Sequence, residues 1–286
     1  ASVPNDDGGN VWLDGDYRMQ AADTTMYQYP ASSTDPISSP WVAADTIDDS
    51  EYGWAVGPIK TPQGLHALYS TIYNDNCPGN GCISRIERIA LSGNAPNYGT
   101  PAATGSDQAG NVYATVLKHV GDESPWAIDA HLFYDDATQK LWMTWGGHNM
   151  WITELDPTSG TIIDPATGQA PASPDFTSHA VGVHTRILAF TQWEGAGSYP
   201  GGMYDAPDDW SGDAWATQAY AEGPSLFKHG DFFYACASYG SMEDSYTIRC
   251  CRAAGPRGPY TDKDGIDCTS FDSAKGRYGA SMLLGP

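Results

Sequence analysis

Basic residues are scarce in this sequence. The 286 residues include 14 Lys and Arg against 35 Asp and Glu, which gives a formal net charge of −21. A surface of this sign repels phosphate backbones and anionic lipid headgroups. We therefore expect no nucleic-acid partner and no membrane partner, and we interpret most of the carboxylates as a solvated acidic surface.

The sequence also lacks long apolar runs and a charged, apolar leader. No stretch approaches the roughly 20 apolar residues that a membrane-spanning helix needs, so we expect a mature protein that has been secreted. Zinc-ligand patterns, a phosphate-binding glycine loop and a His-Glu-x-x-His motif are missing as well. These absences predict chemistry that requires neither a metal nor a cofactor.

Six cysteines without a zinc pattern favour three disulfides. Cys77 and Cys82 flank a Pro-Gly-Asn-Gly loop, and Cys236 and Cys250 lie at equal distances from a turn, as cross-strand neighbours do. Cys251 then points to the opposite face of its strand. The predicted pairs are Cys77–Cys82, Cys236–Cys250 and Cys251–Cys268. Disulfides indicate an oxidising, extracellular compartment.

A short hairpin unit recurs four times along the chain. Each unit has an apolar strand, a turn containing Gly or Asp and an aromatic-rich strand, over residues 10–20, 56–69, 131–145 and 225–236. Repeated hairpins followed by a further strand are typical of propeller blades. We predict one all-β domain over residues 1–286, with blades that begin near residues 10, 54, 127 and 222.

Carboxylates precede three of the four units. In a propeller the innermost strands converge on one axis, so the residues at their starts share a pocket. The candidates are Asp7 with its neighbour Asp6, Asp129, and Glu222. Asp129 and Glu222 lie next to apolar residues without an evident cationic partner, which favours a functional role for both.

Two segments resemble glycoside hydrolase family 43. One is Ala127-Ile-Asp-Ala-His-Leu-Phe-Tyr134, continuing to Gly147 and the segment 152–160, and the other is Glu222-Gly-Pro-Ser-Leu-Phe-Lys-His-Gly-Asp-Phe-Phe-Tyr234. The resemblance covers nearly the whole chain. It implies a five-bladed β-propeller that hydrolyses α-L-arabinofuranosyl or related pentosyl linkages, with Glu222 as general acid and Asp129 as the residue that modulates its pKa.

The general base is less sharply defined by this resemblance. The family usually has His-Asp-Pro at the start of the first blade, where this chain has Asn5-Asp6-Asp7-Gly8. Counting back from Asp14 places Asp7 at the position of the base, with Asp6 as the adjacent alternative. Some galactan-active relatives have glycines instead of this aspartate, and Gly8-Gly9 is similar to them.

An inverting glycosidase needs a protonated acid at the leaving oxygen and an ionised base that holds water on the opposite face. A third carboxylate raises the pKa of the acid by like-charge repulsion. Aromatic side chains near the axis stack on sugar rings, although most tryptophans in a propeller pack instead. The expected substrate-binding residues are Trp54, Trp126, His131, Trp145 and His148. A structural calcium ion on the propeller axis is compatible with the resemblance.

The chain departs from the family after the segment 276–286, where relatives continue with a Gly-His segment and several strands. We therefore expect an incomplete fifth blade, completed by a second chain or fragment. The resemblance leaves arabinan, xylan and β-1,3-galactan open as substrates, and both endo and exo action. A carbohydrate-binding propeller without catalysis is the alternative from a different functional class.

Overall fold

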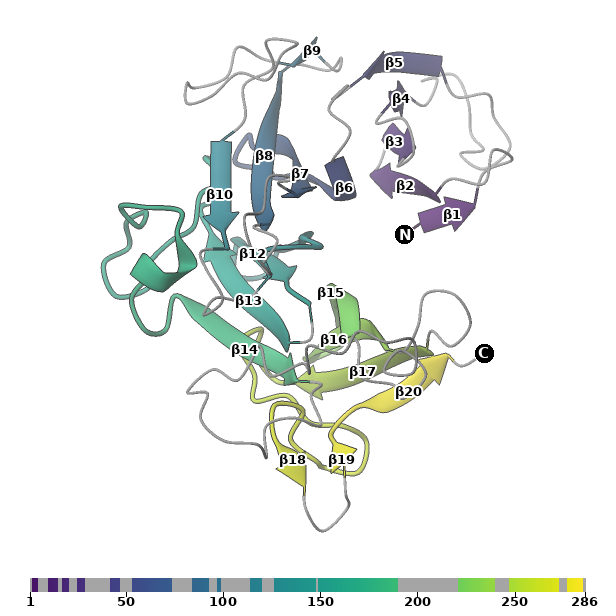
Figure 1. Ribbon diagram of the computed structural model, residues 1–286, viewed down its shortest axis with the longest axis vertical. Helices are drawn as coiled ribbons and strands as arrows, with labels where there is room; N and C mark the ends of the chain where they lie inside the picture. The colour runs from purple at the N-terminus through teal and green to yellow at the C-terminus, as the bar shows by residue number, and fades with distance from the viewer. Residues whose placement is uncertain are drawn as a thin grey trace.

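The computed structural model describes residues 2–4, 10–14, 17–20, 25–28, 42–46, 53–73, 84–92, 97–98, 114–119, 126–147, 149–189, 221–239, 247–272 and 277–284. Among these residues the structure is all-β, with one 3-10 turn, η1 (Phe176–Ser178), and no α-helix. The sheets succeed one another in chain order around an arc (Figure 1). None of the described segments forms a helix long and apolar enough to cross a membrane.

The first sheet has five antiparallel strands in chain order. Its strands are β1 (Ser2–Pro4), β2 (Asn10–Asp14), β3 (Tyr17–Gln20), β4 (Thr25–Gln28) and β5 (Val42–Thr46). The predicted hairpin over residues 10–20 corresponds to β2 and β3. The sheet begins earlier than predicted, because β1 pairs with the edge of β2 that faces away from β3.

The second sheet is ordered β6, β7, β8, β10, with β9 attached to β8. Its strands are β6 (Gly53–Lys60), β7 (His66–Tyr73), β8 (Ser84–Ser92), β9 (Asn97–Tyr98) and β10 (Ala114–Lys118). Ala67, Tyr69 and Thr71 alternate along β7 and are all fully buried. This period of two places one continuous face of β7 against the third sheet.

The third sheet lies between two cores. Its strands, in antiparallel order, are β11 (His131–Asp135), β12 (Lys140–Trp145), β13 (Asn149–Leu155) and β14 (His184–Ala189). Leu141, Met143 and Trp145 on β12 pack into the core shared with the second sheet. Trp142 belongs to the core shared with the fourth sheet. Because β12 is covered on both faces, its sequence is apolar almost throughout.

The fourth sheet is ordered β15, β16, β17, β20. Its strands are β15 (Ala221–His229), β16 (Phe232–Tyr239), β17 (Thr247–Ala253) and β20 (Ser281–Leu284), and a separate two-stranded ladder joins β18 (Phe271–Asp272) to β19 (Arg277–Tyr278). Within the segment 276–286, β20 pairs with β17 as the last strand of the fourth sheet. The incomplete fifth blade stays a prediction.

Polar side chains connect neighbouring sheets at the hairpin end. The hydroxyl of Thr61, in the turn between β6 and β7, donates to the carbonyl of Pro157 at 2.6 Å. The buried hydroxyl of Tyr69 donates to the carbonyl of Gly160 at 2.7 Å. These bonds join the second sheet to the third, because Pro157 and Gly160 belong to the turn that follows β13.

Two of the three predicted disulfides are confirmed. Cys236 and Cys250 are directly opposed on β16 and β17, with their Cα atoms 4.1 Å apart. Cys251 faces the other side of β17, in the core, and is bonded to Cys268. Cys77 and Cys82 lie outside the described residues.

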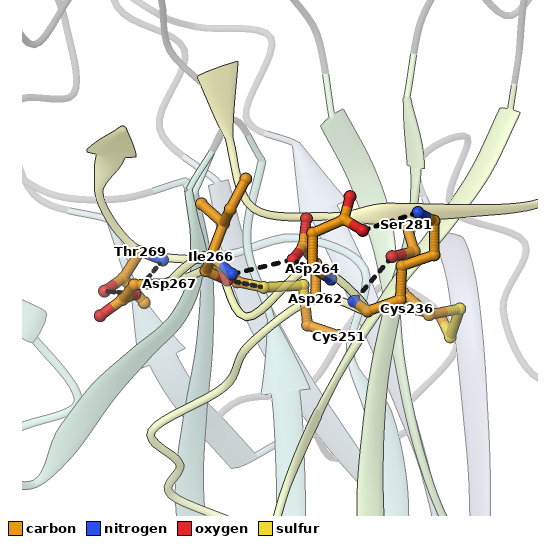
Figure 2. The surroundings of a disulfide bond; sticks show 11 residues. Cys236, Cys251, Asp262, Asp264, Ile266, Asp267, Thr269 and Ser281 are labelled. Atoms are coloured by element: carbon orange, nitrogen blue, oxygen red, sulfur yellow. Dashed lines mark hydrogen bonds and ion pairs between the residues drawn. A yellow bond between two sulfur atoms is a disulfide. The ribbon is translucent and has the colours of Figure 1, made fainter. Parts of the chain in front are cut away.

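The loop that carries Cys268 is folded around one carboxylate (Figure 2). One oxygen of Asp262 accepts the backbone N–H groups of Asp264 and Ile266, both at 2.9 Å. The N–H of Lys263 donates to the hydroxyl of Ser281 on β20. Together with the disulfide, these bonds return the chain to β17 and explain why β20 joins the fourth sheet.

Removal of the Cys251–Cys268 disulfide is expected to destabilise the fourth sheet. The bond closes a loop with a sequence separation of 17, and a closure of this length contributes about 3 kcal/mol in the chain-entropy account. The double substitution Cys251→Ala with Cys268→Ala should lower the free energy of unfolding in urea by about that amount. The double variant Cys236→Ala with Cys250→Ala, which removes the other disulfide of the fourth sheet, is measured in the same way for comparison. A loss below about 1 kcal/mol for the first pair would contradict the structural role.

Candidate active site

Asp129 lies where three sheets meet. It precedes β11 of the third sheet, and its backbone N–H donates to the hydroxyl of Thr71 on β7 at 2.9 Å. Its carboxylate oxygen Oδ2 accepts the backbone N–H of Gly223 on β15 at 3.0 Å. The same residue is therefore bonded to the second and the fourth sheets.

The backbone around Asp129 is closely packed. Asp129 has a φ of 55°, a left-handed conformation that is uncommon for residues other than glycine. The carbonyl of Ile128 accepts the N–H of Gly146 at 2.9 Å. A Cβ atom on Gly57 of β6 would lie 2.4 Å from the carbonyl oxygen of Ala130, so a glycine is required for this approach. The backbone from Ile128 to Ala130 is thus held between Gly57 of β6 and Gly146, the residue that follows β12.

Glu222 lies on β15 beside an irregularity in the strand. The register of β15 against β16 shifts between Glu222 and Ser225, and Gly223 there has a φ of 62°. Glu222 is partly exposed. The N–H that binds the carboxylate of Asp129 belongs to the peptide bond immediately after Glu222. The structure therefore brings the Asp129 carboxylate to the backbone next to Glu222, a residue 93 positions further along the sequence.

Burial controls the ionisation of Asp129. It raises the pKa of Asp129 from 3.8 to about 6, and the hydrogen bond from Gly223, which favours the ionised form, only partly opposes this shift. The residue as a whole is nevertheless partly exposed. Asp129 is consequently a carboxyl group that changes its protonation state in the mildly acidic range.

His131 connects β11 to β15. Its ring nitrogen Nδ1 accepts the backbone N–H of Leu226 at 3.3 Å, which requires that the proton of the neutral ring is on Nε2. Burial lowers the pKa of His131 to about 4. The ring is therefore neutral at pH 7 and holds the first strands of the third and fourth sheets together.

The predicted tryptophans occupy different environments. Trp126 is partly exposed and precedes Asp129 by three residues. Trp145 is fully buried, and it stacks on Trp151 with ring centroids 6.0 Å apart. Its Nε1 donates to the hydroxyl of Thr153 at 2.9 Å. A ring without exposed surface offers no face to a sugar, so Trp145 is a packing residue in this structure.

Of the remaining predicted site residues, the structure gives only the strand register of Trp54. Trp54 on β6 is paired in register with Thr71, which places it at the same end of the second sheet as the contact with Asp129. Asp7, its neighbour Asp6 and His148 lie outside the described residues. No group of three or more His, Cys, Asp or Glu residues that could hold a metal occurs in the described part of the chain. The axial calcium ion therefore stays a prediction.

Thr71 was not found by sequence reasoning. A threonine inside an apolar strand is ordinary, and its partner lies 58 residues further along the chain. The one signal that could have found it is the period of two along β7, which places Thr71 on the same face as Ala67 and Tyr69.

The fold is similar to that of several arabinanases of known structure. The Cellvibrio cellulosa arabinanase in complex with arabinohexaose has a TM-score of 0.61 at 18% identity, over 96% of this chain and 76% of that chain. The native Bacillus subtilis arabinanase has a TM-score of 0.55 at 15% identity, over 96% and 78% of the two chains. A family 43 endo-arabinanase from Bacillus licheniformis has a TM-score of 0.53 at 14% identity, over 96% and 78%.

Sequence comparison adds no closer relative: no protein-family model and no curated protein matches the chain. At identities this low the structural likeness establishes the fold alone. The chain has the β-propeller fold of the arabinanases.

The raised pKa of Asp129 predicts a characteristic dependence of stability on pH. The native state retains the proton of Asp129 up to about pH 6, whereas the unfolded chain loses it near pH 3.8. This contribution to stability is therefore fully present below pH 3.8 and is lost as the pH rises to 6. Asn does not titrate, so the stability of Asp129→Asn relative to the wild type should increase by about 2 kcal/mol between pH 4 and pH 7.

Urea unfolding at a series of pH values measures this difference. Asp156→Asn is the matched control with the opposite sign. Although burial opposes it, the N–H groups of Ser159 and Thr158 hold the pKa of Asp156 below its usual range. This control should therefore lose stability relative to the wild type as the pH rises from acid. Parallel stability curves for wild type and Asp129→Asn would contradict the buried environment of Asp129.

Proposed function

We propose that this chain is a secreted glycoside hydrolase that cleaves α-L-arabinofuranosyl linkages of arabinan-type polysaccharides with inversion of configuration. The observation that carries the proposal is the hydrogen bond from the Gly223 N–H to the carboxylate of Asp129, which holds that carboxylate beside Glu222. The fold supports the choice of substrate, because the similar Cellvibrio cellulosa enzyme was determined with arabinohexaose. The two disulfides of the fourth sheet are compatible with secretion.

In the proposed reaction Glu222 is the general acid. It donates its proton to the glycosidic oxygen as the bond between that oxygen and the anomeric carbon breaks. Asp7, or the adjacent Asp6, is the proposed base, which takes a proton from the water that attacks the anomeric carbon from the opposite face. Inverting enzymes hold these two carboxyl groups roughly 6.5–9.5 Å apart, so that the water fits between base and substrate.

Asp129 is the proposed modulator of the acid. Above about pH 6 its carboxylate is ionised, and a negative charge close to Glu222 disfavours ionisation of Glu222. Glu222 would therefore keep its proton at the pH at which the base is already ionised. This division of protonation states between neighbouring carboxyl groups is what acid–base catalysis requires.

Trp126 is the proposed sugar-stacking residue, because it is partly exposed and belongs to the segment that carries Asp129. Trp54 and His148 remain proposed substrate contacts. His131 is proposed to act on substrate binding only through β15, since its Nδ1 is bonded to Leu226.

Substitution of the acid tests the mechanism. Glu222→Gln should lower kcat on linear α-1,5-arabinan at least 100-fold, the contribution expected of a general acid, with KM and thermal unfolding little changed. An aryl α-L-arabinofuranoside with a good leaving group needs little protonation, so the loss on that substrate should be much smaller.

Glu154→Gln is the matched control. Glu154 lies on β13, where its side chain is paired with Lys140 at 2.8 Å, and this substitution should leave both rates unchanged. Near-normal hydrolysis of arabinan by Glu222→Gln would reject the assignment. Wild-type activity confined to xylan or β-1,3-galactan would reject arabinan as the substrate and would leave the proposal of a glycoside hydrolase in place. Glycan binding without cleavage by the wild type would favour the carbohydrate-binding propeller.

A further inference from the structure

We propose that Thr71 is a positioning residue for Asp129, whose hydroxyl holds the left-handed backbone that presents the Asp129 carboxylate to the segment carrying Glu222. Thr71 itself does not contact the substrate in this account. The inference deepens the proposed function and rests on it for its catalytic consequence, whereas the structural relation between Thr71 and Asp129 is testable without any activity.

The contact between the two residues is partly buried and specific. Thr71 is fully buried on β7, and its hydroxyl is the acceptor of the Asp129 N–H at 2.9 Å. Asp129 is flanked by Ile128 and Ala130, which are both buried. A buried N–H that loses its acceptor is costly, so removal of the Thr71 hydroxyl favours a different orientation of this peptide.

The conformation of Asp129 makes this bond consequential. A φ of 55° is unfavourable for a residue with a Cβ atom, and such conformations persist only where the surroundings enforce them. The Thr71 hydroxyl fixes the N–H of Asp129, and the Gly223 N–H fixes its carboxylate. Relaxation of the backbone to an extended conformation would turn the carboxylate away from Gly223.

The same kind of contact occurs at the next sheet boundary. The hydroxyl of Thr144, which is fully buried on β12, donates to the carbonyl of Pro224 at 3.3 Å. In both cases a hydroxyl from the second strand of one sheet binds the segment that opens the next sheet. Thr71 differs in that its partner is the backbone of a carboxylate residue of the candidate site.

Thr71→Val removes the acceptor with little change in shape, and Thr71→Ser retains the hydroxyl. Thr61→Val is the matched control, since Thr61 is a buried threonine in the turn between β6 and β7 and its hydroxyl donates to Pro157 at the hairpin end. Both Val variants lose one bond to the third sheet, and Thr61→Val also loses the bond that the Leu65 N–H donates to the Thr61 hydroxyl. Only Thr71→Val loses the bond to Asp129.

The first measurement requires no activity. The change in stability caused by Asp129→Asn is measured between pH 4 and pH 7 in the wild-type, Thr71→Val and Thr61→Val backgrounds. We expect its pH dependence to fall at least twofold in Thr71→Val, because Asp129 moves towards solvent, and to persist in Thr61→Val. An undiminished pH dependence in Thr71→Val would overturn the proposal, whether or not the protein is an enzyme.

The second measurement uses arabinan hydrolysis. Thr71→Val should lower kcat about tenfold with KM changed less than about twofold, and Thr71→Ser should restore most of the rate. The basic limb of the pH–rate profile should move to lower pH, because withdrawal of the Asp129 charge lowers the pKa of Glu222. Identical kcat values and pH profiles for Thr71→Val and Thr61→Val would reject positioning. An inactive wild type would instead count against the proposed function alone.

Discussion

Asp129 has a left-handed backbone at the junction of three sheets, and the candidate site depends on that conformation. Its N–H reaches Thr71 in the second sheet while its carboxylate reaches the N–H of Gly223 in the fourth. An extended residue at this position could not make both contacts in the same way. The local strain is accommodated because Gly57, Gly146 and Gly223 supply close approaches and positive φ angles that other residues disfavour.

The sheets around this residue provide the rigidity that the contacts require. The third sheet is buried on both faces, because Leu141 and Met143 of β12 pack into one core and Trp142 packs into the other. The hydroxyls of Thr61 and Tyr69 donate hydrogen bonds at the hairpin end, and the hydroxyl of Thr71 accepts one at the other end. These bonds fix the second sheet against the third. The fourth sheet is reinforced by the Cys251–Cys268 disulfide, whose half-cystines are both buried in the core beside β15.

The features that follow from short-range periodicity were predictable from the sequence. The equal distances of Cys236 and Cys250 from a turn predicted their pairing, and the period of two placed Cys251 on the other face of its strand, with Cys268 as the remaining partner. Repetition of the hairpin placed Asp129 and Glu222 at the starts of neighbouring sheets. Features set by packing between distant segments were not predictable: Trp145 is enclosed by Trp151 and its neighbours. Likewise, β20 joins the fourth sheet because the loop around Asp262 redirects the chain.

The central claim is that Asp129 and Glu222 act on one glycosidic bond. A crystal structure of the Glu222→Gln variant with a linear α-1,5-arabino-oligosaccharide tests it most directly. The account predicts that the side chain at position 222 lies within hydrogen-bond distance of one glycosidic oxygen, with the Asp129 carboxylate still bonded to Gly223 next to it. An oligosaccharide bound away from these residues, or an Asp129 carboxylate that points away from Gly223, would contradict the account.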